Sequence, residues 1–127
     1  MRRSRVVFNK GIPNKYGAHK TVWNGRRYDS KFEAIIAREL DLRMKSGEFT
    51  EIIPQYKIEV TAHRSDGTKV RLFNYICDFR CQRPDGSYLL VEVKGMLTAT
   101  YRLKKKALEL LWLPDNPGYD FEEVKQN

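Results

Sequence analysis

The segment Val91-Glu92-Val93-Lys94-Gly95 places two charged side chains within an otherwise apolar stretch of the chain. Side chains two residues apart on a β-strand point to the same face, so Glu92 and Lys94 should share one face while the two valines point to the other. A carboxylate and an ammonium group that enter a mostly apolar sheet need a partner or a function. The pattern therefore predicts a central strand over residues 88–94 with charged chemistry on one face.

A second acid, Asp78, lies in the similarly apolar stretch Asn74-Tyr75-Ile76-Cys77-Asp78-Phe79. Residues 70–82 predict a strand, and the turn at residues 84–86 (Pro-Asp-Gly) should join it to the strand at 88–94 as a hairpin. Counting outward from this turn can place Asp78 beside Glu92, whereas a register slip of one residue would move it away.

Two neighbouring carboxylates repel each other unless a cation lies between them. Oxygen ligands of this kind suit Mg²⁺, for which Mn²⁺ can substitute. A bound Mg²⁺ would polarise a phosphate and help to deprotonate an attacking water, and Lys94 would orient that water or stabilise charge on the phosphorus. The alternative is a surface salt bridge between Glu92 and Lys94 on an exposed sheet face.

The segments on either side of this hairpin predict a mixed α/β domain. Residues 21–28 read as a tight hairpin with an Asn-Gly turn, and residues 29–46 read as a helix that ends before a glycine. A strand interrupted near Pro54 follows over residues 50–60, and a last short strand is expected over 119–124. A single sheet with a helix on each side is the expected packing.

Two apolar stripes are expected to bury the helices. The stripe of the first helix should comprise Phe32, Ile35, Ile36 and Leu40. A second helix over residues 99–112 ends before Pro114, and its stripe should comprise Leu103, Ala107, Leu110 and Leu111.

Glu33 has two interpretations that its spacing leaves open. Ser30-Lys31-Phe32-Glu33 is a capping box, in which the glutamate reaches back to the backbone amide of the N-cap residue. Glu33 also lies at the edge of the apolar stripe, from which it would reach a metal held by the two strands.

Charge indicates a nucleic-acid partner. The chain of 127 residues carries 24 Lys and Arg against 16 Asp and Glu, a net charge of +8. Residues 1–20 read as a basic N-terminal arm, followed by a single domain over residues 21–127. The side chains expected to bind a nucleic-acid backbone are Arg2, Arg3, Arg5, Lys15, Lys20, Arg26, Arg27, Lys31, Lys104 and Lys105. For the last two, a solvated helix face is an equally open interpretation.

Other classes of protein are disfavoured. Cys77 and Cys81 lack the spacing and the second ligand pair of a zinc site, so they should be reduced, partly buried thiols. No apolar run approaches the ~20 residues that span a bilayer, and the N-terminus lacks a signal-peptide core, so a cytoplasmic location is expected. There is no P-loop or related Gly-rich phosphate cradle.

The order of these segments resembles the PD-(D/E)XK, restriction-endonuclease-like superfamily. Its nearer match is a family of small phage and prophage proteins without a settled function, similar to Holliday-junction resolvases. The likeness rests on Lys15-Tyr16-Gly17-Ala18, Tyr28-Asp29-Ser30-Lys31-Phe32-Glu33-Ala34, Gln55, Tyr75-Ile76-Cys77-Asp78-Phe79, Val91-Glu92-Val93-Lys94-Gly95 and Tyr101-Arg102-Leu103-Lys104-Lys105-Lys106.

The resemblance implies a function for each residue of the motif. Asp78 and Glu92 would bind Mg²⁺, Lys94 would be the catalytic lysine, and Glu33 would complete the metal site from its helix. Two departures are a cysteine instead of a proline before Asp78 and a glutamate where many phage relatives carry aspartate. Gln55 falls where some superfamily members keep a polar residue, although a surface position at a strand edge is the simpler interpretation.

These expectations define three functions to be compared. The first is a structure-selective DNA endonuclease, such as a phage resolvase of Holliday junctions or branched DNA, which implies a homodimer because resolution needs two symmetric cuts. The second is a nicking, restriction or repair nuclease that acts on duplex DNA. The third is a DNA-binding module of the same fold without catalysis; a structural phage protein is a further alternative. Tyr101 would either stack on a base or pack in the core.

Overall fold

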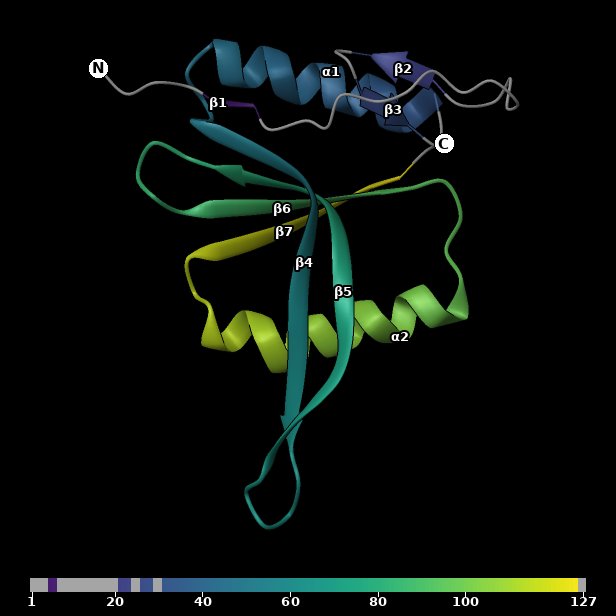
Figure 1. Ribbon diagram of the computed structural model, residues 1–127, viewed down its shortest axis with the longest axis vertical. Coiled ribbons are helices and arrows are strands. Elements are labelled where there is room, and N and C mark those ends of the chain that lie inside the picture. Colours follow the sequence, from purple (N-terminus) through teal and green to yellow (C-terminus); the bar gives the residue numbers. More distant parts are fainter. Residues whose placement is uncertain (1–4, 7–20, 24–25, 29–30, 126–127) are drawn as a thin grey trace.

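The computed structural model describes residues 5–6, 21–23, 26–28 and 31–125, with side chains over 31–125 (Figure 1). The elements in chain order are β1 (Arg5–Val6), β2 (Thr21–Trp23), β3 (Arg26–Tyr28), α1 (Lys31–Lys45), β4 (Glu51–His63), β5 (Lys69–Gln82), β6 (Tyr88–Lys94), α2 (Ala99–Ala107) and β7 (Tyr119–Lys125).

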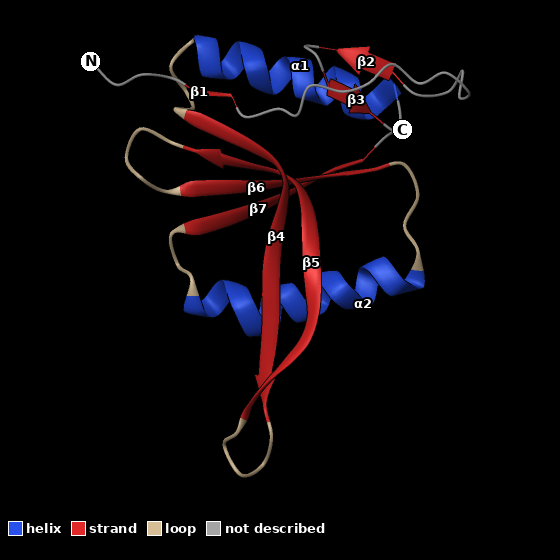
Figure 2. Ribbon diagram, in the orientation of Figure 1, coloured by secondary structure: helices blue, strands red, loops and turns tan. Residues whose placement is uncertain are grey.

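A mixed sheet with the strand order β1-β4-β5-β6-β7 forms the centre of the fold. Strands β4, β5 and β6 are antiparallel neighbours joined by tight turns, whereas β7 runs parallel to β6 after the crossover through α2. Figure 2 shows α1 and α2 on opposite sides of this sheet. The predicted class, an α/β domain with a mixed sheet flanked by helices, is confirmed.

Helix α1 buries one face against the sheet. Ile36, Leu40 and Met44 are buried in a core that also contains Phe79 and Val91. The helix ends as predicted at Gly47, whose φ of +92° lets its N–H reach the carbonyl of the last turn. The expected stripe was wrong at Ile35, which is 46% exposed, because the buried stripe continues through small alanines instead.

The β4–β5 hairpin is long and changes the helix that it packs against along its length. Ile52 near its start packs in the α1 core, whereas Ile58 packs in the core beneath α2. Between them Gln55 has a positive φ of 53°, and it is absent from the residue pairs of the β4–β5 ladder. This irregularity lies where the interruption near Pro54 was expected. Figure 1 shows the tip of the hairpin extending beyond α2.

Helix α2 begins at the N-cap Thr98, whose hydroxyl accepts a hydrogen bond from the backbone N–H of Tyr101 at 3.1 Å. Tyr101 and Leu108 are its buried residues. The predicted stripe was wrong at Leu103, Leu110 and Leu111, which are 72%, 67% and 37% exposed. The regular helix ends before Leu108 and a π-helical turn follows over Leu108–Trp112, so the buried face does not keep one α-helical phase.

The N-terminal segments agree with the expectations where they are described. β2 and β3 form the predicted antiparallel hairpin, and its Asn-Gly turn lies outside the described residues. β1, which falls within the expected arm, pairs in parallel with β4. The rest of the arm also lies outside the described residues.

Both cysteines are free thiols, as predicted, and they are fully buried instead of partly buried. Within the described ranges, no helix is both long enough and apolar enough to cross a membrane.

Candidate functional site

The candidate site lies where β5 and β6 part. Their ladder runs from Gln82 opposite Tyr88 to Phe79 opposite Val91, and Asp78 and Glu92 are the next residues outward on the two strands. Beyond that pair, a carboxylate oxygen of Asp78 accepts a hydrogen bond from the backbone N–H of Val93 at 2.7 Å. The Asp78 side chain therefore takes the place of a strand partner at the point of divergence.

The predicted alternation of faces on β6 is confirmed. Val91 packs in the α1 core and Leu90 packs in the α2 core, so Glu92 and Lys94 share the α2 side with Leu90. The register that brings Asp78 beside Glu92, and not the slipped one, is the one observed.

Glu92 is a nearly fully buried acid, with 3% of its surface exposed. The hydroxyl of Tyr75 donates a hydrogen bond to its Oε1 at 2.7 Å, and Lys94 Nζ lies 3.5 Å from its Oε2. Burial, together with the neighbouring Asp78 carboxylate, raises the pKa of Glu92 to about 8. Tyr75 and Lys94 act in the opposite direction without cancelling this rise.

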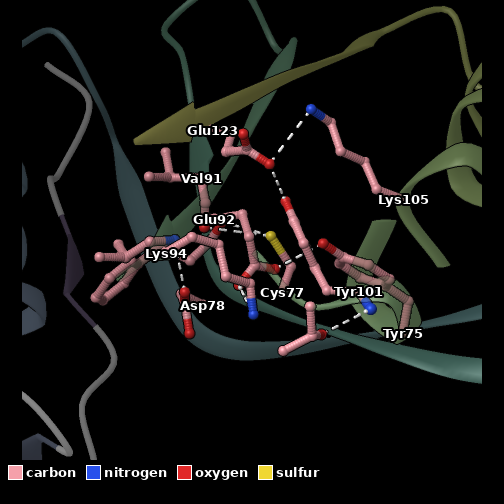
Figure 3. Close-up of polar contacts among 12 residues, drawn as sticks. Tyr75, Cys77, Asp78, Val91, Glu92, Lys94, Tyr101, Lys105 and Glu123 are labelled. Carbon is pink, nitrogen blue, oxygen red and sulfur yellow. Dashed lines mark hydrogen bonds and ion pairs between the residues drawn. The ribbon is translucent and has the colours of Figure 1, made fainter. Parts of the chain in front are cut away.

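Lys94 is oriented by an aromatic ring as well as by an acid. Its Nζ lies 4.2 Å from the centroid of the Tyr101 ring, a cation–π contact. The side chain is 29% exposed, and 3.5 Å to Glu92 is longer than an ordinary N–H···O hydrogen bond. Figure 3 shows Lys94 near Asp78, Glu92 and Tyr101. Its ammonium donors remain available to an incoming group.

Glu92, Lys94 and Tyr101, but not Asp78, line a pocket of about 260 Å³ between β5, β6 and the start of α2. Its lining residues include Tyr75, Glu92, Lys94, Thr98, Tyr101 and Lys104. The pocket is lined by a buried carboxylate, two lysines and two aromatic rings. Such a lining suits a phosphate attached to a flat organic group.

Glu123 on β7 is the paired neighbour of Glu92 in the parallel ladder. The hydroxyl of Tyr101 donates a short hydrogen bond to it, and Lys105 and Lys125 lie 3.3 and 3.4 Å from its carboxylate oxygens. Burial acts to raise the pKa of Glu123, but the hydrogen bond from Tyr101 and the two lysines outweigh it, so the pKa is lowered. Glu123 is thus a stable anion that fixes the Tyr101 ring beneath Lys94 (Figure 3).

Residues 13–125 match a family described as a protein of unknown function, DUF1064. The chain belongs to the DUF1064 family. No curated protein and no solved structure matches it. The matched range contains Asp78, Glu92 and Lys94, so the candidate site lies within the DUF1064 domain.

Asp78, Glu92 and Lys94 are neighbours in this DUF1064 protein. Glu33 is partly buried in the first turn of α1, and its part in a metal site stays a prediction. Across the described part of the chain, no group of three or more His, Cys, Asp or Glu side chains is arranged to hold a metal. Asp78 and Glu92 nevertheless fit a divalent cation as a pair of hard oxygen donors whose mutual repulsion a cation would relieve.

The predicted nucleic-acid ligands are only partly described. Arg2, Arg3, Lys15 and Lys20 lie outside the described residues, and only the backbones of Arg5, Arg26 and Arg27 are described. Lys31 and Lys104 are exposed, and Lys104 lines the candidate pocket. Lys105 is partly buried and is held by Glu123.

Tyr75 and Glu123 were not identified as site residues from the sequence. Tyr75 was read as one aromatic residue of an apolar strand, and Glu123 as one acid of a short last strand. Their roles follow from the twist of β5 and from the parallel register of β6 and β7, and short-range patterns encode neither feature. The aromatic position Tyr101 was noted, and the structure assigns it to packing beneath Lys94.

Proposed function

We propose that this protein is a metal-dependent nuclease that hydrolyses phosphodiester bonds in DNA. The observation that carries the proposal is the juxtaposition, at the parting of β5 and β6, of the buried Glu92, its neighbour Asp78 and the half-exposed Lys94. A buried acid beside a second acid is unfavourable for folding alone. A cation-binding and phosphate-binding role explains why the fold retains it.

Asp78 and Glu92 are the residues that would hold Mg²⁺ in this mechanism. When bound, the cation polarises the scissile phosphate and lowers the pKa of a water molecule. Lys94 donates to a phosphate oxygen and stabilises the negative charge that grows on it. Tyr75 positions Glu92 through its hydroxyl, and Tyr101 positions Lys94 through its ring.

The reaction is a simple hydrolysis. The oxygen of water forms a bond to phosphorus, and the bond from phosphorus to one ester oxygen breaks. The leaving oxygen takes up a proton from solvent, and the attacking water releases one. No further co-reactant is needed.

Charge and resemblance support DNA as the substrate. The chain has a net charge of +8. The order of α1, the Asp78 strand, the Glu92–Lys94 strand and α2 is also the order on which the likeness to PD-(D/E)XK nucleases rests. A structure-selective resolvase of branched DNA, acting as a homodimer, is the specific form that we propose. A nicking, restriction or repair nuclease on duplex DNA is the enzymatic alternative.

A cleavage assay tests the proposal. Labelled four-way junction, linear duplex and single strand with the same arms are incubated with wild type, with Mg²⁺ or EDTA. We expect symmetric, Mg²⁺-dependent cuts in the junction, and a loss of at least about 100-fold in Asp78→Asn. Asp115→Asn is the matched control, because Asp115 is exposed in the turn that precedes β7.

The other outcomes discriminate between the alternatives. Cutting of linear duplex alone keeps the site and changes the substrate. Binding of DNA by wild type without any cutting in Mg²⁺ or Mn²⁺ overturns the nuclease. That result favours a non-catalytic DNA-binding module, an alternative supported by the absence of a three-ligand metal group within the described residues.

A further inference from the structure

A second pocket, of about 300 Å³, lies on the side of Tyr101 away from the candidate site, between α2 and β7. Tyr101 lines both pockets, so the two are immediate neighbours. The charged side chains of this second pocket are Arg102, Lys105, Lys106, Glu109, Glu123 and Lys125. Four cationic side chains thus face two acids.

The two acids are already occupied within the pocket. Glu123 binds Lys105 and Lys125, and Glu109 lies 3.8 Å from Lys105. These contacts hold two of the cations in place and leave the excess charge on the others. The pocket therefore has a net positive charge, and some of its charged side chains are held in place by ion pairs.

Arg102 and Lys106 supply the excess positive charge of the pocket. They are four residues apart on α2, so their side chains are neighbours on one face of the helix, and both are exposed. Neither forms an ion pair with any residue that the structure describes. Like charges at this spacing destabilise a helix, and the first turn of α2 contains no acid to offset them. An anion bound between them would remove the repulsion.

We propose that this second pocket binds a phosphate group of a nucleic-acid strand, next to the scissile phosphate of the proposed reaction. The proposal rests on the nuclease function for the identity of the strand. The chemistry of the pocket needs only a phosphate: two free cations, a lysine pair fixed by Glu123 and one wall of aromatic ring. Tyr101 separates the two phosphates, with its ring toward Lys94 and its hydroxyl toward Glu123.

The test measures binding and not cleavage. The affinity of wild type and of Arg102→Gln/Lys106→Gln for a short single-stranded oligonucleotide is measured in EDTA over a range of salt concentrations. We expect about a tenfold loss of affinity in the double variant at low salt. Its plot of log affinity against log salt should also be shallower by about 0.7 for one lost phosphate contact.

Arg38→Gln/Lys57→Gln removes the same charge from two exposed positions outside the pocket, on α1 and β4, and is the control. If the control loses as much affinity as the test variant, or the test variant binds with wild-type affinity and slope, the proposal is overturned. Because Arg102 and Lys106 are exposed, thermal melting should show an unchanged or higher Tm for the test variant. A fall in Tm of more than a few degrees would contradict the like-charge repulsion on which the proposal depends.

Inorganic phosphate and a mononucleotide separate the sources of the ligand. Chemical-shift changes at Lys106 and Glu123 with an oligonucleotide, and much weaker changes with the small anions, support a strand. Equal affinity for a free mononucleotide would overturn it in favour of a small-molecule site. If wild type binds the oligonucleotide as expected but cuts nothing, the phosphate pocket stands and the nuclease alone fails.

Discussion

Glu92 and Glu123 are paired residues on the parallel strands β6 and β7, yet their carboxyl groups have opposite acidities. Burial beside Asp78 raises the pKa of Glu92 to about 8. Glu123 is the reverse case, because Tyr101 and two lysines lower its pKa despite its burial. One glutamate is therefore a stable structural anion, and its neighbour keeps its proton to a higher pH.

The acidity of Glu92 predicts how stability depends on pH. Below about pH 8 the folded protein keeps a proton on Glu92. The unfolded chain releases this proton near the ordinary pKa of a glutamate. The free energy of unfolding should therefore fall as pH rises from 5 to 8 in EDTA, by at most about 1.4 kcal/mol per pH unit from this group. Glu92→Gln should flatten this fall, and Mg²⁺ should raise the Tm of wild type at pH 8.

Thermal melts across this pH range, with and without Mg²⁺, check the prediction. Glu59→Gln changes an exposed glutamate on β4 in the same way and should follow wild type. Identical pH dependence in wild type and Glu92→Gln would show that Glu92 does not carry the effect.

Lys94 should matter for turnover more than for binding. Replacing it with methionine keeps much of the packing against Tyr101 and removes the charge that, in the proposed mechanism, stabilises the reacting phosphate. We expect kcat to fall by about 100-fold to 1,000-fold, with less than about a fivefold change in Kd. Single-turnover cleavage and binding in EDTA measure the two effects. Lys57→Met, at an exposed position on β4, is the control, and a loss confined to Kd would contradict a catalytic role.

Alanine substitutions at a buried and at an exposed leucine of the second helical segment should lower the free energy of unfolding by unequal amounts. Leu108 is fully buried, so Leu108→Ala should lower the free energy of unfolding by about 2–5 kcal/mol. Leu103 is 72% exposed, so Leu103→Ala should change it by less than about 0.5 kcal/mol. Urea unfolding measures both, and a larger loss for Leu103→Ala than for Leu108→Ala would mean that the helix presents the face expected from its sequence.

Gln55 should affect the stability of the protein and not the proposed cleavage reaction. Its φ of 53° is a conformation that favours glycine. Gln55→Gly should stabilise the protein by up to about 1 kcal/mol, after the greater entropy of the unfolded chain is allowed for. Denaturant unfolding and cleavage of the same variant are the measurements. A variant that is stable but inactive would assign Gln55 to the site instead.

Local patterns in the sequence predicted the part of the site that one hairpin contains. The alternation of Glu92 and Lys94 with two valines gave the face of each side chain. The short turn at residues 84–86 then allowed the register with Asp78 to be counted. Both rules act over a few residues and do not depend on the rest of the fold.

The remaining features depend on distant segments. Glu123 reaches Glu92 only through the crossover of α2, and the register of a parallel pair is not fixed by a turn. Tyr75 and Asp78 differ by an odd number of positions, and only the twist of β5 allows both side chains to approach Glu92. The predicted face of α2 was wrong at Leu103 because Tyr101 and Leu108, seven positions apart, define a different buried face. Beyond Ala107 the π-helical turn changes the phase again.

The parting of β5 from β6 just beyond Phe79 and Val91 has a consequence for where the chain tolerates insertions. A residue added between Gln82 and Tyr88 would risk changing which side chain lies opposite Glu92. The length of this short connection is therefore constrained by the pairing of Asp78 with Glu92. The tip of the β4–β5 hairpin, around Gly67, carries no such constraint. A peptide tag or a fluorescent label inserted there should leave the spacing of Asp78 and Glu92 intact and provide a handle for following the protein in binding experiments.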